Sequence, residues 1–415
     1  MNCQLKQEQV KKVVGEYGSP LYIFHKQEFV ENYWDLLNTF RSIYPKYNIA
    51  YSYKTNYTPR VCQLVKEMGG LAEVVSEMEY ALAKKIGYSN DQIIYNGPIK
   101  GRGLFDHLMN GGTVNIDNLD EMDNVIRLAE KNPDKTLKIA FRVNVDIGQG
   151  FISRFGLDTE TAEKTELDTA FELVKSCPNL TLVGMHCHVG RSRSVQAWKN
   201  RIDKMFKLLD HYFGEKLPEF ISLGSGMNSV MEPSLAEQFD GHIPTYQEYA
   251  NVVAEAMNER YKDVPLKNKP FLFTEPGTTL ISGYMSFLTT VKNIKTVRGK
   301  MFATFDSSDG NMGDICRLKR LPISVFQQSD SQVYCEEIDF VGYTCIEHDV
   351  IYKGYSGKLG VGDIVQFRNV GSYSNVFKPP FILPNCAMIE IDEDGNTELI
   401  KRAETLEDIF QTYIF

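Results

Sequence analysis

The chain lacks any long apolar run, and none of its 415 residues belongs to a stretch hydrophobic enough to cross a bilayer. The residues from Met1 to Lys6 lead into a polar helical segment and not into the apolar core of a signal peptide. The eight cysteines are scattered, without CxxC pairing or other metal-ligand spacing. These absences argue against a membrane protein and a disulfide-rich protein, and we expect a cytoplasmic protein with reduced thiols.

A large excess of charge of one sign is also lacking. The formal net charge is -9, with acidic and basic residues interspersed along the chain. This balance argues against nucleic acid or an anionic membrane as the main partner. The composition, 43% hydrophobic and 24% charged, is that of an ordinary globular protein, and the length allows two domains.

Short apolar segments alternate with helical segments over much of the chain. Eight of them have the pattern of strands: Ile49–Tyr53, Leu71–Val75, Ile93–Tyr95, Thr113–Ile116, Leu137–Val145, Leu182–His188, Phe220–Leu223 and Phe271–Thr274. Eight alternating units favour an α/β fold in which a (β/α)8 barrel spans residues 27–278. An open, doubly wound sheet is the alternative, but no GxGxxG fingerprint follows the first strand.

Helical patterns become rare after residue 278. Strand patterns separated by Gly, Asp and Ser turns replace them, at residues 287–294, 332–341, 363–369 and 387–391. We therefore predict a mainly antiparallel β domain formed by residues 279–415 together with residues 1–26. The early strand Leu21–Phe24 is expected to pair into this domain.

Polar residues follow the expected barrel strands at their carboxyl ends, where the active site of such a barrel lies. Lys54 follows the first strand, and Glu275-Pro276-Gly277 follows the eighth. His186-Cys187-His188 ends the sixth strand, and Gly224-Ser225-Gly226 follows the seventh. Taken singly, the lysine is a surface residue or a Schiff-base amine, and the glycine turn is a plain turn or an anion-binding nest.

One cofactor needs this whole set of groups. Pyridoxal phosphate requires a lysine, a phosphate nest, a flat group against its ring and a carboxylate at its pyridine nitrogen. The histidines His186 and His188 share a strand face, but a third ligand is not apparent near them, so we expect no metal site.

In their order along the chain, these features resemble the alanine-racemase-barrel family of pyridoxal-phosphate decarboxylases, which includes diaminopimelate, ornithine and arginine decarboxylases. The resemblance covers roughly residues 18–390. Its motifs are Tyr51–Asn56, Glu73–Ser76, Asn96–Lys100, Ser153–Gly156, His186–Gly190, Gly224–Gly226, Glu275–Gly277, Cys345–Asp349 and Gly371–Tyr373.

The resemblance implies a role for each matching residue. Lys54 would carry the cofactor as an aldimine, His188 would stack on its ring, and Glu275 would pair with the ring nitrogen. Arg142 would support Glu275 or the surroundings of the ring. The phosphate would be held by the glycine turn with Tyr373, and the remaining residues expected near the cofactor are Gly224, Ser225, Gly226, Gly277 and Thr278.

The resemblance also implies a homodimer whose active sites are shared between subunits. Cys345 would reach the cofactor of the other subunit and return a proton after carbon dioxide leaves. Two positions depart from the family pattern: Thr278 replaces the usual arginine after Glu-Pro-Gly, and Arg191 replaces a usual serine. We hypothesise that Arg191 supplies the missing guanidinium to the phosphate or to a carboxylate.

A third departure concerns the substrate. Ile346 stands where the family commonly has an acidic residue for a distal amine, so Glu347 or Asp349 would have to serve instead. Arg317 and Arg320 align ambiguously with the position that binds a substrate carboxylate. We expect a decarboxylase for an amino acid, a diamino acid or a conjugate in a specialised biosynthetic pathway. The alternatives are an amino-acid racemase on the same fold and a non-catalytic relative that binds a protein partner.

Overall fold

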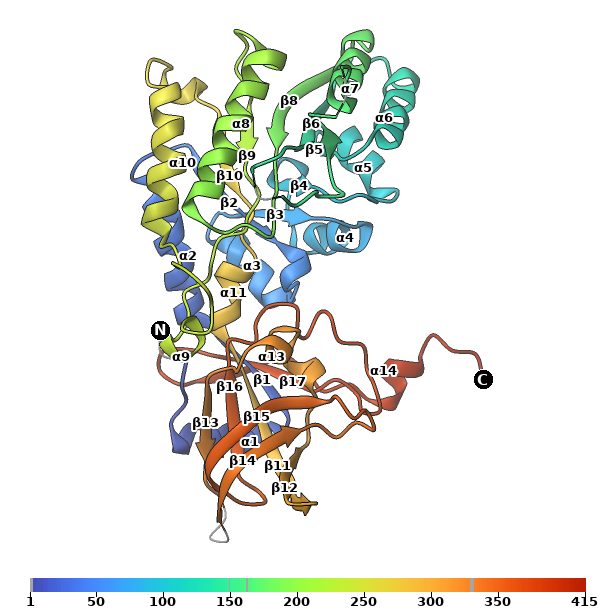
Figure 1. The fold of residues 1–415 in the computed structure, drawn as a ribbon. Coiled ribbons are helices and arrows are strands. Elements are labelled where there is room, and N and C mark those ends of the chain that lie inside the picture. The colour runs from blue at the N-terminus through green and yellow to red at the C-terminus, as the bar shows by residue number, and fades with distance from the viewer. Residues whose placement is uncertain (1–2, 149, 162, 329–331) are drawn as a thin grey trace. The chain divides into compact units, whose positions relative to one another are not determined.

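The computed structural model describes residues 3–148, 150–161, 163–328 and 332–415. The chain divides into two compact units, which Figure 1 shows as ribbons. The barrel unit comprises residues 33–228 and 242–277. The β unit comprises residues 1–32, 229–241 and 278–415.

Eight parallel strands form the closed sheet of the barrel unit (Figure 1). They are β2 (Tyr47–Ser52), β3 (Leu71–Val74), β4 (Ile93–Tyr95), β5 (Thr113–Ile116), β6 (Leu137–Asn144), β8 (Leu180–His186), β9 (Phe220–Ser222) and β10 (Phe271–Thr274). The sheet closes because β5 pairs with β6 and β10 pairs with β2. The (β/α)8 barrel expected from the sequence is confirmed. A short strand, β7 (Leu157–Asp158), adds a further pairing to the end of β6.

Helices cover the outer face of this sheet, as the buried faces of their apolar residues require. They are α3 (Pro59–Glu67), α4 (Glu77–Ile86), α5 (Gly103–Met109), α6 (Leu119–Lys131), α7 (Glu166–Ser176), α8 (Val195–Phe213) and α10 (Tyr246–Arg260), with the 3-10 turns η1 (Tyr53–Thr55), η2 (Asn90–Gln92) and η3 (Leu266–Asn268). Side-chain caps fix where several of them begin. Ser76 and Asn118, for example, each accept a hydrogen bond from a backbone N–H in the first turn of α4 and α6.

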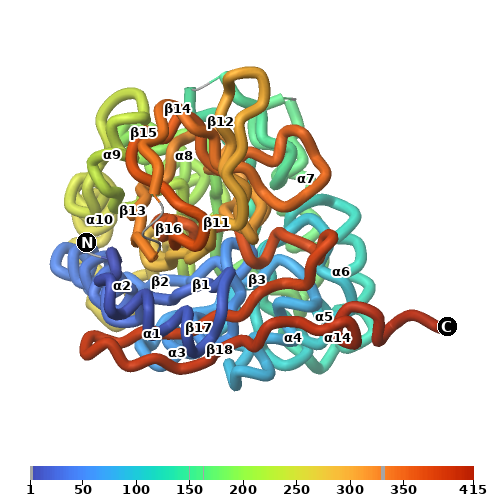
Figure 2. Tube along the Cα trace, turned by 90° about the horizontal axis from the view of Figure 1, so that it is seen from below, coloured from blue at the N-terminus to red at the C-terminus, as the bar shows by residue number. Residues whose placement is uncertain are grey.

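The β unit is built on a second, mostly antiparallel sheet. Its strands are β1 (Leu21–His25), β11 (Met285–Val297), β12 (Lys300–Phe305), β13 (Ile323–Phe326), β14 (Val333–Val341), β15 (Val350–Leu359), β16 (Ile364–Arg368), β17 (Ala387–Ile391) and β18 (Thr397–Lys401). The N-terminal strand β1 lies between β11 and β17, so the first and last parts of the chain meet in one sheet (Figure 2). The expected pairing of the N-terminal strand into the β domain is confirmed.

The helices of the β unit are short, apart from α1 and the start of α2. They are α1 (Gln7–Tyr17), α2 (Lys26–Arg41, which continues into the barrel unit), α9 (Pro233–Ala236), α11 (Thr278–Ile281), α12 (Asp309–Met312), α13 (Ile315–Leu318) and α14 (Leu406–Phe410), with the 3-10 turn η4 (Ser282–Tyr284). Val10 and Val13 of α1 pack on the sheet with Leu21, Ile23 and Leu288. None of the described helices combines the length and the hydrophobicity that a membrane crossing needs.

Two segments that the sequence assigned to the barrel belong to the β unit, residues 27–32 and 229–241. Asn32 donates a hydrogen bond from Nδ2 to the backbone oxygen of Thr279 at 3.0 Å. Glu232 forms an ion pair with Arg368 of β16, with Nη2 2.9 Å from Oε2. These contacts are long-range, so the periodicity of the sequence does not indicate them.

Candidate active site

Lys54 lies in η1, directly after β2, at the carboxyl-end rim of the barrel. Tyr53 and Thr55 on either side are buried and fix the turn, while the Lys54 side chain stays 39% exposed. Its Nζ lies 2.9 Å from Oε2 and 3.2 Å from Oε1 of Glu73. The amine is therefore held at the end of the neighbouring strand by a carboxylate.

Glu73 is a buried residue of β3. Its Oε2 accepts a hydrogen bond from Oγ of Ser52 at 2.5 Å, and its Oε1 accepts one from Nδ2 of Asn96 at 2.9 Å. Ser52 and Glu73 are partners in the β2–β3 ladder, which brings their side chains to the same place on the barrel. A buried carboxylate needs both an ion pair and hydrogen bonds, and Lys54 completes this set.

Glu275 is a second buried carboxylate, immediately after β10. Its Oε1 accepts a hydrogen bond from Oγ of Ser222 at 2.7 Å. Its Oε2 lies 2.9 Å from Nε2 of His186 and accepts a hydrogen bond from Nδ2 of Asn96 at 3.0 Å. Burial favours the neutral acid, but these partners and the Lys54 ammonium hold the pKa of Glu275 well below its usual range. Glu275 is therefore ionised.

Asn96 joins the two carboxylates, because its Nδ2 donates to Glu73 and to Glu275. Its own Oδ1 accepts a hydrogen bond from Nδ2 of Asn115 at 2.6 Å, which fixes the orientation of the amide. A continuous polar chain follows, which we call the rim network: Lys54, Glu73, Asn96, Glu275 and His186. It crosses five strand ends of the closed barrel.

His188 follows β8 and is held by the glycine turn after β9. Its Nδ1 accepts a hydrogen bond from the backbone N–H of Ser225 at 3.0 Å, so a neutral ring carries its proton on Nε2. Burial, together with the positive charges of Lys54 and Arg142, lowers the pKa of His188 well below its usual value. His188 is thus a neutral, oriented ring. Its neighbour His186 is engaged with Glu275, and the two histidines do not act as a pair.

The glycine turn approaches His188 too closely for any side chain. A Cβ on Gly224 would lie 2.6 Å from Cβ of His188, and one on Gly226 would lie 2.9 Å from the backbone oxygen of Val189. Both glycines also have positive φ, +58° and +102°. Gly277 is restricted in the same way, because its Cβ would lie 2.0 Å from Oγ1 of Thr55.

A buried arginine on α8 supports this turn. Arg201 donates hydrogen bonds from Nη1 to the backbone oxygens of Leu223 and Ser225, at 2.6 and 2.9 Å, and from Nη2 to that of Val189 at 3.0 Å. Because N–H and C=O point in opposite directions in a trans peptide, the N–H of Gly226 faces away from Arg201. Of the expected nest, the amide of Ser225 is already bonded to His188, whereas the Gly226 amide is directed outward, that is, away from the Arg201 side of the turn.

The end of β10 is joined to its neighbours by backbone hydrogen bonds. The N–H of Glu275 donates to the oxygen of Gly224 at 2.7 Å, and the N–H of Ser52 donates to the oxygen of Pro276 at 3.2 Å. These bonds, with the close contact of Gly277 and Thr55, place the last strand end against the first. Thr278, the next residue, begins α11 in the β unit.

The arginines expected near the cofactor have partners within the barrel unit. Nη1 of Arg142 lies 3.5 Å from Oδ1 of Asp117, and its guanidinium lies 4.8 Å from the ring centre of Phe155. The guanidinium of Arg191 lies 4.7 Å from the ring centre of Phe151. Arg142 contributes positive charge beside His188, whereas Arg191 is held at an exposed part of the rim.

The cysteine motif forms the loop between β14 and β15. Cys345, Ile346 and Glu347 are exposed, whereas Asp349 is buried. Both oxygens of Asp349 are used within the unit, because they accept hydrogen bonds from the N–H of Asp309 at 2.7 Å and the hydroxyl of Thr344 at 2.5 Å. Asp349 therefore holds the loop that presents Cys345.

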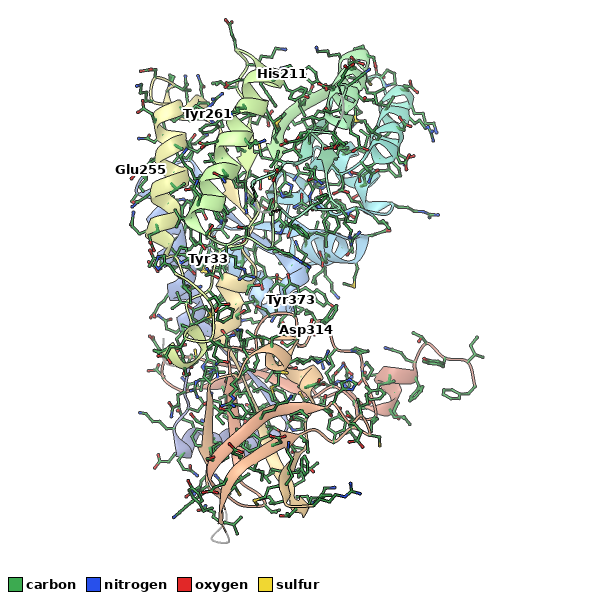
Figure 3. The ribbon with its side chains drawn as sticks, viewed as in Figure 1. Tyr33, His211, Glu255, Tyr261, Asp314 and Tyr373 are labelled. Atoms are coloured by element: carbon green, nitrogen blue, oxygen red, sulfur yellow. The ribbon has the colours of Figure 1, made fainter. Side chains whose placement is uncertain are left out.

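Tyr373 lies in another loop of the β unit, where Figure 3 labels it near Asp314. Its φ of +51° is unusual for a residue with a large side chain. A Cβ on Gly313 would lie 3.0 Å from the backbone oxygen of Tyr373, so the two loops are in close contact. Arg317 pairs with Asp309, with Nε 2.7 Å from Oδ2.

Several functional contacts were not expected from the sequence. The pairing of Glu73 with Lys54, the bridge through Asn96 and the clamp formed by Arg201 depend on strand register and on which helix face is buried. A polar residue within an otherwise apolar strand, as at Glu73, is the signal that indicates such a role.

Comparison with known families matches residues 33–282 to the pyridoxal binding domain of the pyridoxal-dependent decarboxylases. Diaminopimelate decarboxylase of Archaeoglobus fulgidus is 24% identical over 97% of this chain and 94% of its own. A decarboxylase of Niallia circulans that acts on the L-glutamyl-BtrI acyl-carrier protein is 25% identical, over 99% of this chain and 97% of its own. Diaminopimelate decarboxylase from M. jannaschii, solved with L-lysine, has a TM-score of 0.83 at 23% identity, covering 98% of this chain and 94% of that one.

Proposed function

Because the chain belongs to the pyridoxal-dependent decarboxylases, we propose that it removes the α-carboxylate of an amino acid, a diamino acid or an amino-acid conjugate as carbon dioxide. The rim network is the observation that carries this proposal. In it an amine, Lys54, and an ionised carboxylate, Glu275, follow the first and last strands of a closed barrel and are linked through Glu73 and Asn96.

The residues of the rim fit pyridoxal phosphate. An ionised carboxylate offers about four acceptor positions. Glu275 uses three of them, for Ser222, His186 and Asn96, so one is left for the protonated pyridine nitrogen. The outward amide of Gly226 and the close approach of backbone at Gly224 suit a phosphate. When bound, the cofactor supplies a ring that takes up the electron pair left by carbon dioxide.

Each residue then has a defined task. Lys54 binds the cofactor through Nζ, and Glu73 keeps that amine positioned at the strand end. Glu275 holds the proton on the pyridine nitrogen. His188 would pack against the ring as a neutral imidazole, fixed through Nδ1 by the amide of Ser225. The lowered pKa of His188 keeps it uncharged, so that it does not repel the protonated ring.

The β unit supplies the remaining groups. Cys345 moves a proton from Sγ to the substrate α-carbon once carbon dioxide has left. Following the family resemblance, we assign Tyr373 to the phosphate. In the barrel unit, Arg191 supplies the guanidinium that is missing where Thr278 stands in place of the usual arginine after Glu-Pro-Gly. The enzyme acts as a homodimer in which Cys345 serves the site of the partner subunit.

The substrate proposal rests on the loop after Cys345. Ile346 is exposed and apolar, so it offers no acceptor to a distal ammonium. Asp349 has both oxygens engaged in the loop, which leaves Glu347 and Arg320 as the polar groups for the distal part of a substrate. We therefore propose a substrate other than free diaminopimelate.

Replacing Lys54 tests the proposal. The purified enzyme should be yellow and should lose its visible absorbance on treatment with borohydride, whereas Lys54→Ala should lack the borohydride-sensitive band. Release of carbon dioxide from a panel of amino acids and conjugates should fall by at least about a thousandfold in this variant. Lys66→Ala, on α3, is the matched control. Loss of optical rotation without carbon dioxide would indicate a racemase, and a protein that takes up no cofactor would contradict the proposal.

A further inference from the structure

The β unit contains an open cavity of about 610 Å³ that is lined by Glu347 and Arg320 and extends well beyond these two residues. Its charged lining residues are Arg317, Lys319, Arg320, Lys353, His348 and Glu347. Four of these are arginines or lysines and one is a glutamate, in a chain whose net charge is -9. We call this space the basic cavity. Its size is that of a site for a small organic ligand and exceeds the needs of a single amino acid.

Two of the four cations are already engaged. Arg317 forms ion pairs with Asp309, at 2.7 Å, and with Asp314, at 3.6 Å. The ammonium of Lys319 donates to the backbone oxygen of Gln238 and lies 5.0 Å from the ring centre of Phe239. These two residues form a positively charged wall whose geometry is fixed by the fold.

The other two cations, Arg320 and Lys353, are exposed and line the same cavity. Nη2 of Arg320 comes within 3.6 Å of the position that a Cβ would take on Gly354, the residue after Lys353. Among the described residues, neither forms a salt bridge with a carboxylate. Like charges placed together repel each other unless an anion lies between them. The arrangement is therefore suited to a ligand that carries negative charge.

The basic cavity adjoins the loop that carries Cys345. Glu347 and His348 of that loop line it. Arg317 and His348 also line a second cavity, of about 230 Å³, together with Ile346 and Tyr373. A substrate whose reacting end lies at Cys345 can therefore extend along this loop into the basic cavity.

We propose that the basic cavity binds a phosphate-bearing extension of the substrate, beyond the amino acid that loses its carboxylate. This inference rests on the proposed function and assigns the substrate class. The leaving carboxylate is not the anion concerned, since tight binding of its charge would stabilise the ground state and slow its loss. A distal carboxylate is satisfied by one guanidinium, whereas a phosphate takes hydrogen bonds from several cations at once.

Two kinds of molecule carry this chemistry. One is a small phosphorylated conjugate of an amino acid, and the other is the phosphopantetheine arm of a carrier protein that holds the amino acid. The relative from Niallia circulans acts on a carrier-bound glutamyl group. Both sources place a phosphate at a distance from the reacting carbon, and a comparison of substrates distinguishes them.

Binding of 4′-phosphopantetheine to the holoenzyme, measured by calorimetry, tests the cavity without reference to activity. One molecule should bind per chain, more weakly as ionic strength rises. Arg320→Ala and Lys353→Ala should each weaken binding about tenfold, the value of one lost charge-assisted hydrogen bond. The control is Lys358→Ala, which removes the same charge from an exposed position of the same strand outside the cavity. Absence of binding, or equal affinity in all variants, would overturn the proposal.

Carbon dioxide release then distinguishes the two sources. With a glutamyl group as the common amino acid, kcat/KM is compared for the free amino acid, glutamyl-phosphopantetheine and the glutamyl-carrier protein. A gain of tenfold or more for both conjugates indicates a small phosphorylated substrate, and a gain for the carrier alone indicates protein delivery. Either gain should be lost in Lys353→Ala. A holoenzyme that lacks the borohydride-sensitive band contradicts the proposed function, whereas an intact band without phosphopantetheine binding contradicts only this inference.

Discussion

Glu275 is buried and yet ionised, which a carboxylate achieves only when its surroundings supply both hydrogen bonds and positive charge. His186, Ser222 and Asn96 provide the hydrogen bonds, and Lys54 adds charge through space. The carboxylate is therefore prepared before any ligand arrives. A group that is already oriented and charged stabilises developing charge without reorganisation, which is the largest contribution to most enzymatic rate accelerations.

Replacing Glu275 with glutamine should keep the shape of the site and remove its negative charge. We expect kcat to fall by at least about a hundredfold, because the pyridine nitrogen loses its proton in the absence of an anionic partner. The cofactor should still bind through Lys54, so the borohydride-sensitive band should persist. Absorbance titration and carbon dioxide release measure the two effects separately, with Glu259→Gln on the exposed end of α10 as control. Equal kcat in both variants would exclude the assigned role of Glu275.

At this scale the sequence predicts some site residues and not others. Lys54, His188 and Glu275 are expected because the carboxyl ends of parallel strands share one rim, and each follows a strand that the apolar pattern reveals. Glu73 and Asn96 have the same kind of position, but their role depends on which atoms face each other across two ladders. Register of that kind is set by the closed sheet and not by any local pattern.

At the scale of elements, α8 does more than cover the barrel. Its buried residue Arg201 binds carbonyl oxygens of the loop after β8 and of the loop after β9. The helix thereby fixes the loop of His188 and the glycine turn relative to each other. An arginine on the apolar face of a helix cannot be recognised as a clamp from the sequence, because its partners are backbone atoms of distant loops.

Removing this clamp with Arg201→Met should leave three buried carbonyl oxygens without their donor. We expect a loss of stability of about 3 kcal/mol or more, together with a lower affinity for pyridoxal phosphate, because the Gly226 amide is no longer held outward. Thermal unfolding and cofactor titration measure the two effects. Lys199→Met, which breaks an exposed ion pair on the same helix, should change neither quantity appreciably. A stable variant with unchanged cofactor affinity would show that the clamp is dispensable.

A buried histidine on α5 makes the barrel unit sensitive to acid. Burial lowers the pKa of His107 to about 4, whereas an unfolded chain has a histidine pKa of about 6.5. Between these values the unfolded state binds a proton that the native state does not, so stability falls as pH falls. The loss from this residue is about 1.4 kcal/mol per pH unit over that range, and about 2 kcal/mol at pH 5.

Replacing His107 with phenylalanine should remove this dependence while keeping the edge contacts with Tyr80 and Tyr95. The variant loses the hydrogen bond to Thr113, so it should be less stable at pH 7.5. Its stability should nevertheless fall less between pH 7 and pH 5, which urea unfolding at each pH measures. The control is His211→Phe, at an exposed residue of α8 that Figure 3 labels. If the free energy of unfolding fell as steeply with pH in His107→Phe as in the wild type, His107 would not be the source of the acid sensitivity.

The short helices α12 and α13, each of four residues, could not be predicted from the sequence. A segment of one turn has no periodicity, and both helices are fixed by tertiary contacts such as the ion pair of Arg317 with Asp309. The long strands and barrel helices were predictable because each repeats an apolar pattern over several residues. The basic cavity lies among the elements that the sequence does not reveal.

At the scale of the whole molecule, the proposed homodimer predicts that two inactive variants regain activity when they are mixed. Lys54→Ala and Cys345→Ala should each be nearly inactive. If Lys54 and Cys345 of one site come from different subunits, random mixed dimers regain one intact site in every heterodimer. An equimolar mixture should then recover about a quarter of the wild-type activity. Co-purification of untagged Cys345→Ala with affinity-tagged Lys54→Ala is the control for subunit exchange, and absence of recovery despite exchange would place both residues in the same subunit.

The closure of the barrel has a consequence for how the enzyme matures. Lys54 follows the first strand and Glu275 follows the last, so the two come together only when β10 has paired with β2. Contacts between such distant parts of a chain form late in folding and slowly. With the roles proposed for Lys54 and Glu275, a chain whose barrel has not closed lacks one half of the cofactor site, and cofactor uptake reports that the barrel has closed. Because ligands that bind only the native state stabilise it, a shortage of the vitamin would leave newly made chains more open to proteolysis.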